Sequence, residues 1–126
     1  MGTIRQRHFI KTTPAELYHA MVNPFTIELW SGYKAEMSTE AGSEFSLWEG
    51  EITGRNLEFI PDQKIVQEWD FEGSPERSIV TITLTKNKGG CSVQVLHENV
   101  PDEAMENMEE GWKDYYFGAL KAFFEK

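Results

Sequence analysis

The sequence contains a single cysteine, Cys91, in 126 residues. One thiol can form neither an internal disulfide nor a cysteine-cluster metal site, and Cys91 stands in an alternating apolar run where thiols usually serve as inert packing. Long apolar runs are also lacking: the N-terminal stretch MGTIRQRHFIK has no signal-peptide core, and no segment approaches the length of a membrane span. These absences favour a cytoplasmic protein that does not bind membranes.

Basic residues are scarce. Lys and Arg number 12 against 21 Asp and Glu, so the net charge is −9. Such a surface repels phosphate backbones and anionic membranes, which argues against nucleic acid and lipid surfaces as partners. The acids gather in residues 98–114, where seven of them accompany one lysine for a net charge of −6. This pattern is typical of a solvated helix face; the alternative is an acidic docking surface for a basic partner.

The length predicts one domain, residues 1–126, because two domains of about 60 residues would each bury too little surface to be stable. A hydrophobic content of 40%, with 13% aromatic residues, is ample for one packed core.

The hydrophobic periodicity predicts strands, two short helices and then more strands. Residues 4–11 alternate as a strand does, and TTPAELYHAMV then has helical spacing with Thr13 as its cap and Pro14 at its first position. A second short helix is expected at residues 25–30. Further strands are expected at 33–38, 44–53, 56–60, 64–71, 78–86 and 91–98. Because their connections are short, consecutive strands should pair antiparallel.

The C-terminal segment predicts a long amphipathic helix from Asp102 onward. Its last sixteen residues, GWKDYYFGALKAFFEK, hold six of the chain's aromatic residues. One apolar stripe is expected to comprise Met105, Met108, Trp112, Tyr115 or Tyr116, Ala119 and Phe123. We expect this helix to cover the sheet and to leave a cavity beneath it. Gly111 and Gly118 mark either close backbone approaches or tolerated positions.

Seven motifs in this order match a known family: TPAELYHAM, NPFTIELWSG, GSEFSLWEG, GRNLEFIPDQKIVQEW, SIVTITLT, LHENVP and GWKDYYFGALK. Across nearly its whole length the chain resembles the Hsp90 ATPase activator homologue (AHSA-like) family, within the SRPBCC, START and Bet v-type superfamily. The resemblance implies an α+β helix-grip fold, in which about seven antiparallel strands curve around the C-terminal helix, with two short helices after the first strand. The eukaryotic co-chaperone resembles the chain in its C-terminal domain only.

Strand alternation and helical spacing indicate which side chains line the expected cavity. The predicted ligand-binding residues are Trp30, Phe45, Leu47, Leu57, Phe59, Gln67, Trp69, Val95, His97, Met108, Trp112 and Tyr116. The alternative is that these aromatic and aliphatic residues are plain core.

His97, at the end of an apolar strand face, could hydrogen-bond a ligand or act as an acid or base, or it could be a satisfied core histidine. His8 could join it if the first and last strands pair. No nucleophile-elbow or HxxxH pattern is present, so we predict no catalytic residue, metal or cofactor.

Three functions remain open at this point. The leading hypothesis is non-enzymatic binding of a small hydrophobic or amphipathic ligand between sheet and C-terminal helix. The second is a co-chaperone or stress-response module that docks a chaperone such as an Hsp90 homologue, as the resemblance implies. The third is a cyclase or hydrolase that uses the cavity histidine.

Overall fold

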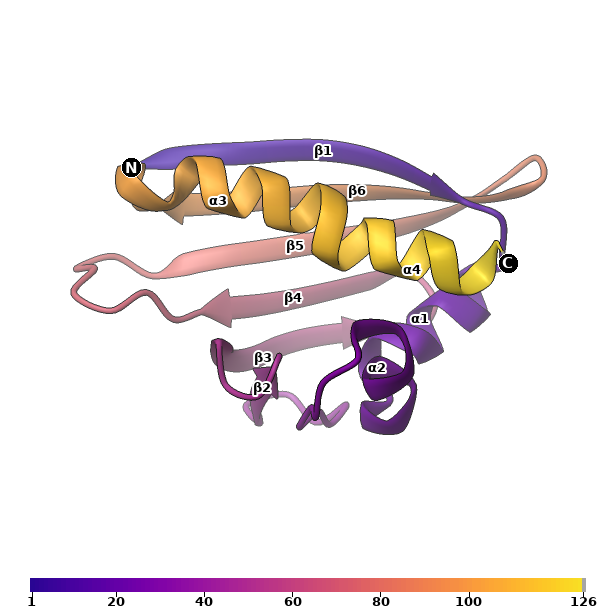
Figure 1. Cartoon of the computed structure of the whole chain (residues 1–126), viewed down its shortest axis with the longest axis horizontal. Helices are drawn as coiled ribbons and strands as arrows, with labels where there is room; N and C mark the ends of the chain where they lie inside the picture. The colour runs from indigo at the N-terminus through magenta and orange to yellow at the C-terminus, as the bar shows by residue number, and fades with distance from the viewer. Residues whose placement is uncertain (126) are drawn as a thin grey trace.

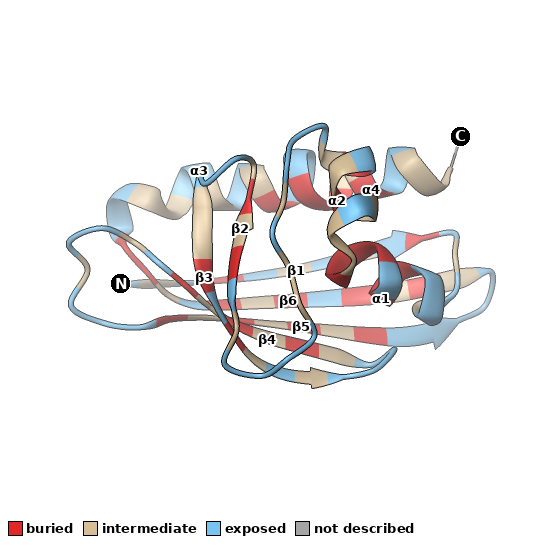
Figure 2. Cartoon of the chain, turned by 90° about the horizontal axis from the view of Figure 1, so that it is seen from below, coloured by how far each residue is buried: buried red, intermediate tan, exposed pale blue. Residues whose placement is uncertain are grey.

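A computed structural model describes residues 1–125 and has the helix-grip architecture expected from the sequence. The elements are β1 (Gly2–Ile10), α1 (Pro14–Val22), α2 (Pro24–Ser31), β2 (Glu44–Leu47), β3 (Ile52–Ile60), β4 (Lys64–Trp69), β5 (Ser78–Asn87), β6 (Gly90–Val100), η1 (Asp102–Ala104), α3 (Met105–Glu110), η2 (Gly111–Tyr116) and α4 (Phe117–Phe124). The sheet is antiparallel in the order β1-β6-β5-β4-β3-β2. The helical segment from η1 to α4 lies across one face of this sheet, with α1 and α2 at one end (Figures 1 and 2).

Both short helices begin at the caps that their sequences offer. The Thr13 hydroxyl accepts a hydrogen bond from the Glu16 amide at 3.1 Å, and the Asn23 carboxamide oxygen accepts one from the Thr26 amide at 3.0 Å. Each cap is followed directly by a proline, which is suited to the first helical position. The end of α1 and the start of α2 therefore share one residue, Asn23.

The strands differ from the expectation in two places. Residues 33–38 make only an isolated bridge between Glu36 and Ser46, so the sheet has six strands within the described chain rather than seven. Residues 44–53 are not one strand, because β2 ends at Leu47 and a four-residue turn leads back into β3. In this turn Trp48 and Glu49 both have positive φ angles, of 50° and 53°, a backbone conformation that residues other than glycine rarely adopt.

The C-terminal helical segment contains a π-helical stretch, η2, in its middle. The Phe117 amide donates to the carbonyl oxygen of Trp112, five residues earlier, instead of to the residue four earlier. The stretch shifts the apolar face of the segment, so Tyr116 is buried and Tyr115 is 69% exposed. Phe117 and Leu120, which the predicted stripe omitted, are fully buried because they follow this shift.

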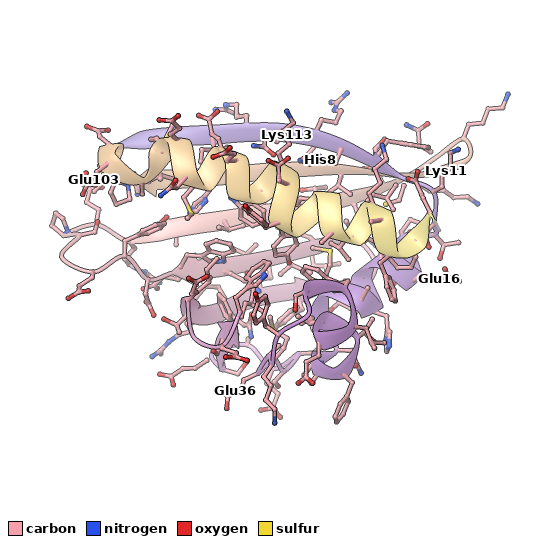
Figure 3. The ribbon with its side chains drawn as sticks, viewed as in Figure 1. His8, Lys11, Glu16, Glu36, Glu103 and Lys113 are labelled. Carbon is pink, nitrogen blue, oxygen red and sulfur yellow. The ribbon has the colours of Figure 1, made fainter. Side chains whose placement is uncertain are left out.

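The opposite side of the segment faces solvent. All seven acids of residues 98–114 are exposed, and Lys113 projects on the side nearest β1 (Figure 3). None of the described helices is long and apolar enough to cross a membrane.

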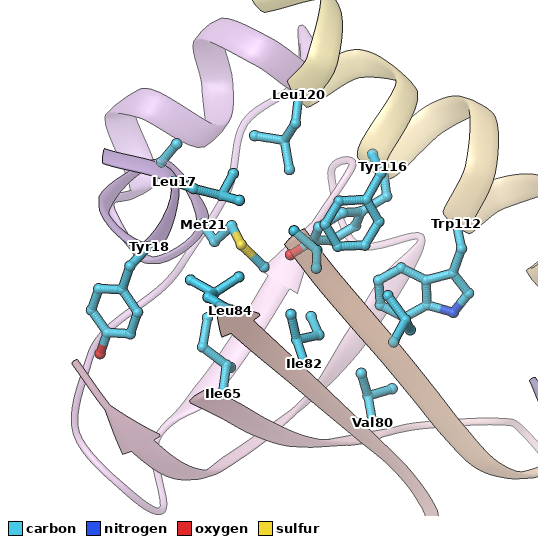
Figure 4. Close-up of a cluster of buried hydrophobic side chains, with 14 of the residues drawn as sticks. Leu17, Tyr18, Met21, Ile65, Val80, Ile82, Leu84, Trp112, Tyr116 and Leu120 are labelled. Carbon is cyan, nitrogen blue, oxygen red and sulfur yellow. The ribbon is translucent and has the colours of Figure 1, made fainter. Parts of the chain in front are cut away.

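The core lies between the sheet, the C-terminal segment and α1. Side chains from all three elements meet there, including Leu17 and Met21 of α1, Ile82 of β5, and Tyr116 and Leu120 of the C-terminal segment (Figure 4). A buried side chain of this size contributes about 2 kcal/mol or more through the area it removes from water. The packing of α1 and the C-terminal segment against each other and against the sheet fixes the position of the segment along the sheet.

Gly118 is required by the π-helical stretch, and its replacement by alanine should destabilise the fold. The added Cβ would lie 2.8 Å from the carbonyl oxygen of Lys113. This is a backbone atom, so relieving the clash requires a change in the π-helical turn itself. We expect Gly118→Ala to lower the free energy of unfolding, measured by urea titration, by about 1–3 kcal/mol.

Gly111 provides the matched control. A Cβ added there meets no atom within 4 Å, so Gly111→Ala should raise the free energy of unfolding by up to about 1 kcal/mol, because alanine is the better helix former. Equal effects of the two substitutions would contradict this role of Gly118.

Candidate functional site

An open cleft of about 830 Å³ lies beside the C-terminal segment. One wall is formed by α3, η2 and the start of α4, and the other by the β2–β3 turn together with the end of α2. The lining residues are Ser31, Tyr33, Trp48, Glu49, Glu51, Ile52, Trp69, Asn107, Met108, Gly111, Trp112, Asp114, Tyr115, Tyr116 and Ala119. Trp69, Met108, Trp112 and Tyr116 are the sequence-predicted residues that this cleft brings together.

The space directly beneath the segment is filled rather than hollow. The indole rings of Trp69 and Trp112 stack at 4.6 Å between centroids, and Trp112 also stacks on Phe117 at 5.9 Å. Six further predicted residues are buried in the core: Trp30, Phe45, Leu47, Gln67, Val95 and His97. The hollow therefore lies at the side of the segment and opens to solvent.

Leu57 and Phe59 do not share a face, because β3 bulges between Asn56 and Glu58. Phe59 lies opposite Ile65 and packs against the core, half-buried. Leu57 lies within the bulge and is half-exposed. The inward position before the bulge belongs to Asn56, a residue that strand alternation alone did not single out.

A buried chain of hydrogen bonds runs inward from Trp69. Its indole N–H donates to the Gln67 carboxamide oxygen at 2.9 Å, and the Gln67 amide nitrogen donates to Asn56 Oδ1 at 3.0 Å. Asn56 Nδ2 in turn donates to the Ser38 carbonyl and the Ser43 hydroxyl. Gln67 is thus satisfied within the protein, and the chain ties the loop of residues 33–43 to the sheet.

A second chain of hydrogen bonds fixes the state of His97. The indole N–H of Trp112 lies 3.0 Å from His97 Nδ1 and can only donate, so Nδ1 carries no proton. The neutral ring must then carry its proton on Nε2, which lies 2.7 Å from the Ser78 hydroxyl, and that hydroxyl donates to the Glu98 carbonyl at 3.1 Å. Both nitrogens are engaged, and His97 is fully buried.

Burial lowers the pKa of His97 to about 4, so the ring is neutral at physiological pH. A ring with both nitrogens committed to Trp112 and Ser78 has no free atom for acid–base work on a ligand. His8 does not join it: β1 and β6 do pair, but His8 lies opposite Val93 while Ile4 lies opposite His97. His8 stacks on Phe117 instead, at 4.8 Å.

Several lining residues were not predicted from the sequence, above all those of the β2–β3 turn. Trp48, Glu49 and Glu51 sit in a stretch that was expected to be continuous strand. Gly50, with a φ of 92°, was the available signal, since an isolated glycine within a strand pattern often marks a break. Trp48 is held over the cleft by ring contacts with Trp30 and Tyr116, each at 6.0 Å.

Tyr116 is the one buried group at the cleft with an uncommitted polar atom among residues 1–125. Its side chain is 3% exposed, and its hydroxyl makes no hydrogen bond to any described residue. In the described chain, every side-chain nitrogen or oxygen that is inaccessible to solvent has a hydrogen-bond partner. Because the Tyr116 hydroxyl has no partner in that part of the chain, it must reach accessible surface. Burial raises the pKa of Tyr116, which keeps the hydroxyl protonated and able to donate.

Comparison with known proteins gives consistent matches. A model of the family described as activator of Hsp90 ATPase homolog 1-like protein matches residues 11–125. The human activator of 90 kDa heat shock protein ATPase homolog 1 is 28% identical over 115 residues, which are 90% of this chain and 34% of that protein. The chain thus spans about a third of the length of the curated relatives it matches.

Solved structures support the fold. An HSP90 activator from Plasmodium falciparum superposes with a TM-score of 0.88 at 23% identity, covering 96% of this chain and 94% of that one. The Aha1 dimer from Colwellia psychrerythraea gives a TM-score of 0.86 at 18% identity, covering 99% and 97% of the two chains.

The depressed pKa of His97 should make stability depend on pH in a defined direction. The folded pKa is about 4 against 6.5 for a free imidazole, so the unfolded chain binds the extra proton between these values. The contribution of His97 is complete above about pH 6.5 and is lost as the pH falls towards 4, up to about 3 kcal/mol.

Urea titrations at several pH values test this dependence. His97→Gln should show a shallower loss of unfolding free energy than the wild type over that range, because the titrating ring is gone. His19→Gln, at an exposed position of α1, is the matched control and should follow the wild type. Parallel wild-type and His97→Gln profiles would refute the assignment.

Proposed function

The chain belongs to the family of activator of Hsp90 ATPase homolog 1-like proteins, and from this premise we propose that it is a non-enzymatic binding domain. Its ligand is a small apolar or amphipathic molecule held in the cleft beside the C-terminal segment. The observation that carries the proposal is an open cleft of about 830 Å³ whose floor is built from aromatic rings, a size and character typical of small-molecule sites.

The floor is rigid, which favours binding without a large ordering cost. Trp112 contacts Tyr116 at 4.8 Å between ring centroids and stacks on Trp69, and the indole N–H of each tryptophan is hydrogen-bonded. Tyr116 also contacts Trp30 at 5.1 Å. Aromatic rings held in this way present a preformed apolar surface to a ligand.

The geometry disfavours the enzymatic alternative that uses a cavity histidine. His97 is buried behind Trp112, outside the residues that line the cleft, and both its ring nitrogens are committed. A general acid or base must reach its substrate within hydrogen-bond distance. A binding role requires no such group.

A co-chaperone role is the second candidate. It is supported by the human relative, which is an activator of the 90 kDa heat shock protein ATPase. The exposed acids of residues 98–114 offer a negatively charged face to a basic surface of a chaperone. This role uses the acids on the outer side of the C-terminal segment, whereas Asp114 lines the cleft.

Filling the cleft should abolish ligand binding. Gly111 lines the cleft and has open space where a side chain would begin, so Gly111→Leu would place an isobutyl group in it. We expect the affinity for N-phenyl-naphthylamine, a neutral apolar probe that fluoresces when bound, to fall by about tenfold or more. Native mass spectrometry of protein purified from its own host should also show a bound small molecule.

Two variants control this experiment. Gly111→Ala adds one methyl group and should weaken probe binding less than leucine does, and Phe25→Ala changes an exposed residue of α2 outside the lining and should have no effect. Equal affinities of the wild type and Gly111→Leu would count against a ligand site in the cleft.

The co-chaperone candidate predicts a salt-sensitive effect on a partner. The chain should stimulate the ATPase of the host's Hsp90 homologue, and less so as salt rises from about 0.05 to about 0.3 M, because salt screens exposed charges. Glu103→Lys with Glu106→Lys should remove the stimulation, whereas Glu36→Lys with Glu40→Lys makes the same charge change elsewhere and should retain it. Absence of stimulation at both salt concentrations would eliminate this candidate.

A further inference from the structure

We propose that the cleft takes a cationic amphiphile, a molecule whose apolar body lies on the aromatic floor and whose ammonium head lies at the rim. The proposal rests on the ligand-binding function above and specifies the class of its ligand. Three features of the cleft support it: the unpaired acids on both walls, the aromatic rings of the lining, and the hydroxyl of Tyr116, which makes no hydrogen bond within residues 1–125.

Three carboxylates form the rim, from both walls of the cleft. Glu49 and Glu51 belong to the β2–β3 turn, and Asp114 belongs to η2 on the facing wall. All three are exposed, and none makes an ion pair or a side-chain hydrogen bond within residues 1–125. An apolar body lying between the walls therefore has carboxylates on either side of it.

Two acids of the sheet form short ion pairs. Glu58 pairs with Lys64 at 3.0 Å, and Glu68 pairs with Arg77 at 2.6 Å. The rim acids have no such partner within residues 1–125, as is also true of Glu98 on β6. Their negative potential is therefore directed at whatever enters the cleft.

Basic side chains do not line the cleft in the described chain. The lining includes no lysine, arginine or histidine from residues 1–125. Lys34 and Lys113 each follow a lining residue in sequence, but neither belongs to the lining, and Lys113 projects on the β1 side of the segment (Figure 3). An anionic head would thus meet three like charges and no counter-charge.

The floor is also suited to a cation. The face of an aromatic ring carries negative potential and attracts ammonium groups, most strongly when the ring is tryptophan. Within the lining, the half-buried indole of Trp48 and the exposed ring of Tyr115 are accessible to a cation, whereas Trp69 and Trp112 are buried and stacked on each other. Apolar burial and attraction for positive charge therefore occur in the same place.

The hydroxyl of Tyr116, a residue of the lining, is free to bond a ligand. The side chain is 3% exposed, but its hydroxyl reaches accessible surface and makes no hydrogen bond within residues 1–125. Its oxygen can accept a hydrogen bond from an ammonium N–H. A ligand with such a donor would bond a polar atom of the lining that has no partner within residues 1–125.

Calorimetric titration with three amphiphiles of equal tail length tests the charge preference. The ligands are decyltrimethylammonium, neutral dimethyldecylphosphine oxide and decyl sulfate, each kept below its micellar concentration. At low salt we expect the cation to bind about tenfold more tightly than the neutral compound, the anion to bind most weakly, and the difference to shrink as salt is added.

Neutralising the rim should remove the preference without removing the site. In the variant that combines Glu49→Gln, Glu51→Gln and Asp114→Asn, the cation should bind about as well as the neutral compound, whose own affinity should stay within about twofold. The control combines Glu98→Gln, Glu103→Gln and Glu106→Gln, changes the net charge equally and should keep the cation preference.

The outcomes separate this inference from the function on which it rests. If the wild type binds the neutral compound as tightly as the cation, or if both triple variants lose the preference equally, the proposal is overturned and the ligand-binding function stands. If none of the three compounds binds, both are overturned.

The role of Tyr116 has its own test. Tyr116→Phe should weaken binding of decylammonium, which has N–H donors, several-fold more than binding of decyltrimethylammonium, which has none. Equal effects on both ligands would remove the hydroxyl from the recognition that we propose.

Discussion

The hydrogen bond from the Trp112 indole to His97 is the interaction on which most of the structure depends. It anchors the C-terminal segment to β6, while the same indole ring stacks on Trp69 of β4. Because the bond occupies Nδ1 of His97, it also sets the tautomer of the ring and the direction of its bond to Ser78. One side chain thus positions the helical segment, sets the tautomer of a histidine and forms part of the cleft floor.

The sequence predicted the regular elements well where the pattern is local. Strand alternation placed Gln67 and Trp69 on the inner face, as observed, and α1 begins after the predicted cap, Thr13. The departures occur where backbone geometry breaks a period. The turn at Trp48 and Glu49, and the bulge after Asn56, cannot be deduced from alternation, because each inserts residues that belong to neither face.

The candidate site divides in the same way. Trp69, Met108, Trp112 and Tyr116 are large side chains on periodic elements, so their inward direction could be predicted. The opposite wall depends on how closely the β2–β3 turn approaches the helical segment, which is a long-range consequence of the whole fold. The interior was expected to be hollow under the segment, yet stacked rings fill it, and the available volume lies beside it.

The π-helical stretch has a consequence for the shape that the chain can adopt. One additional residue in a helical turn rotates everything beyond it by about 100° relative to a regular helix. With Trp112 seated against His97, an unbroken α-helix would direct Phe117 and Leu120 away from the positions they fill under the sheet. The π-helical turn therefore rotates the second half of the helical segment relative to the first, so that the apolar side chains of both halves face the strands. Deleting one residue in this turn would leave the apolar side chains of only one half of the segment facing the sheet.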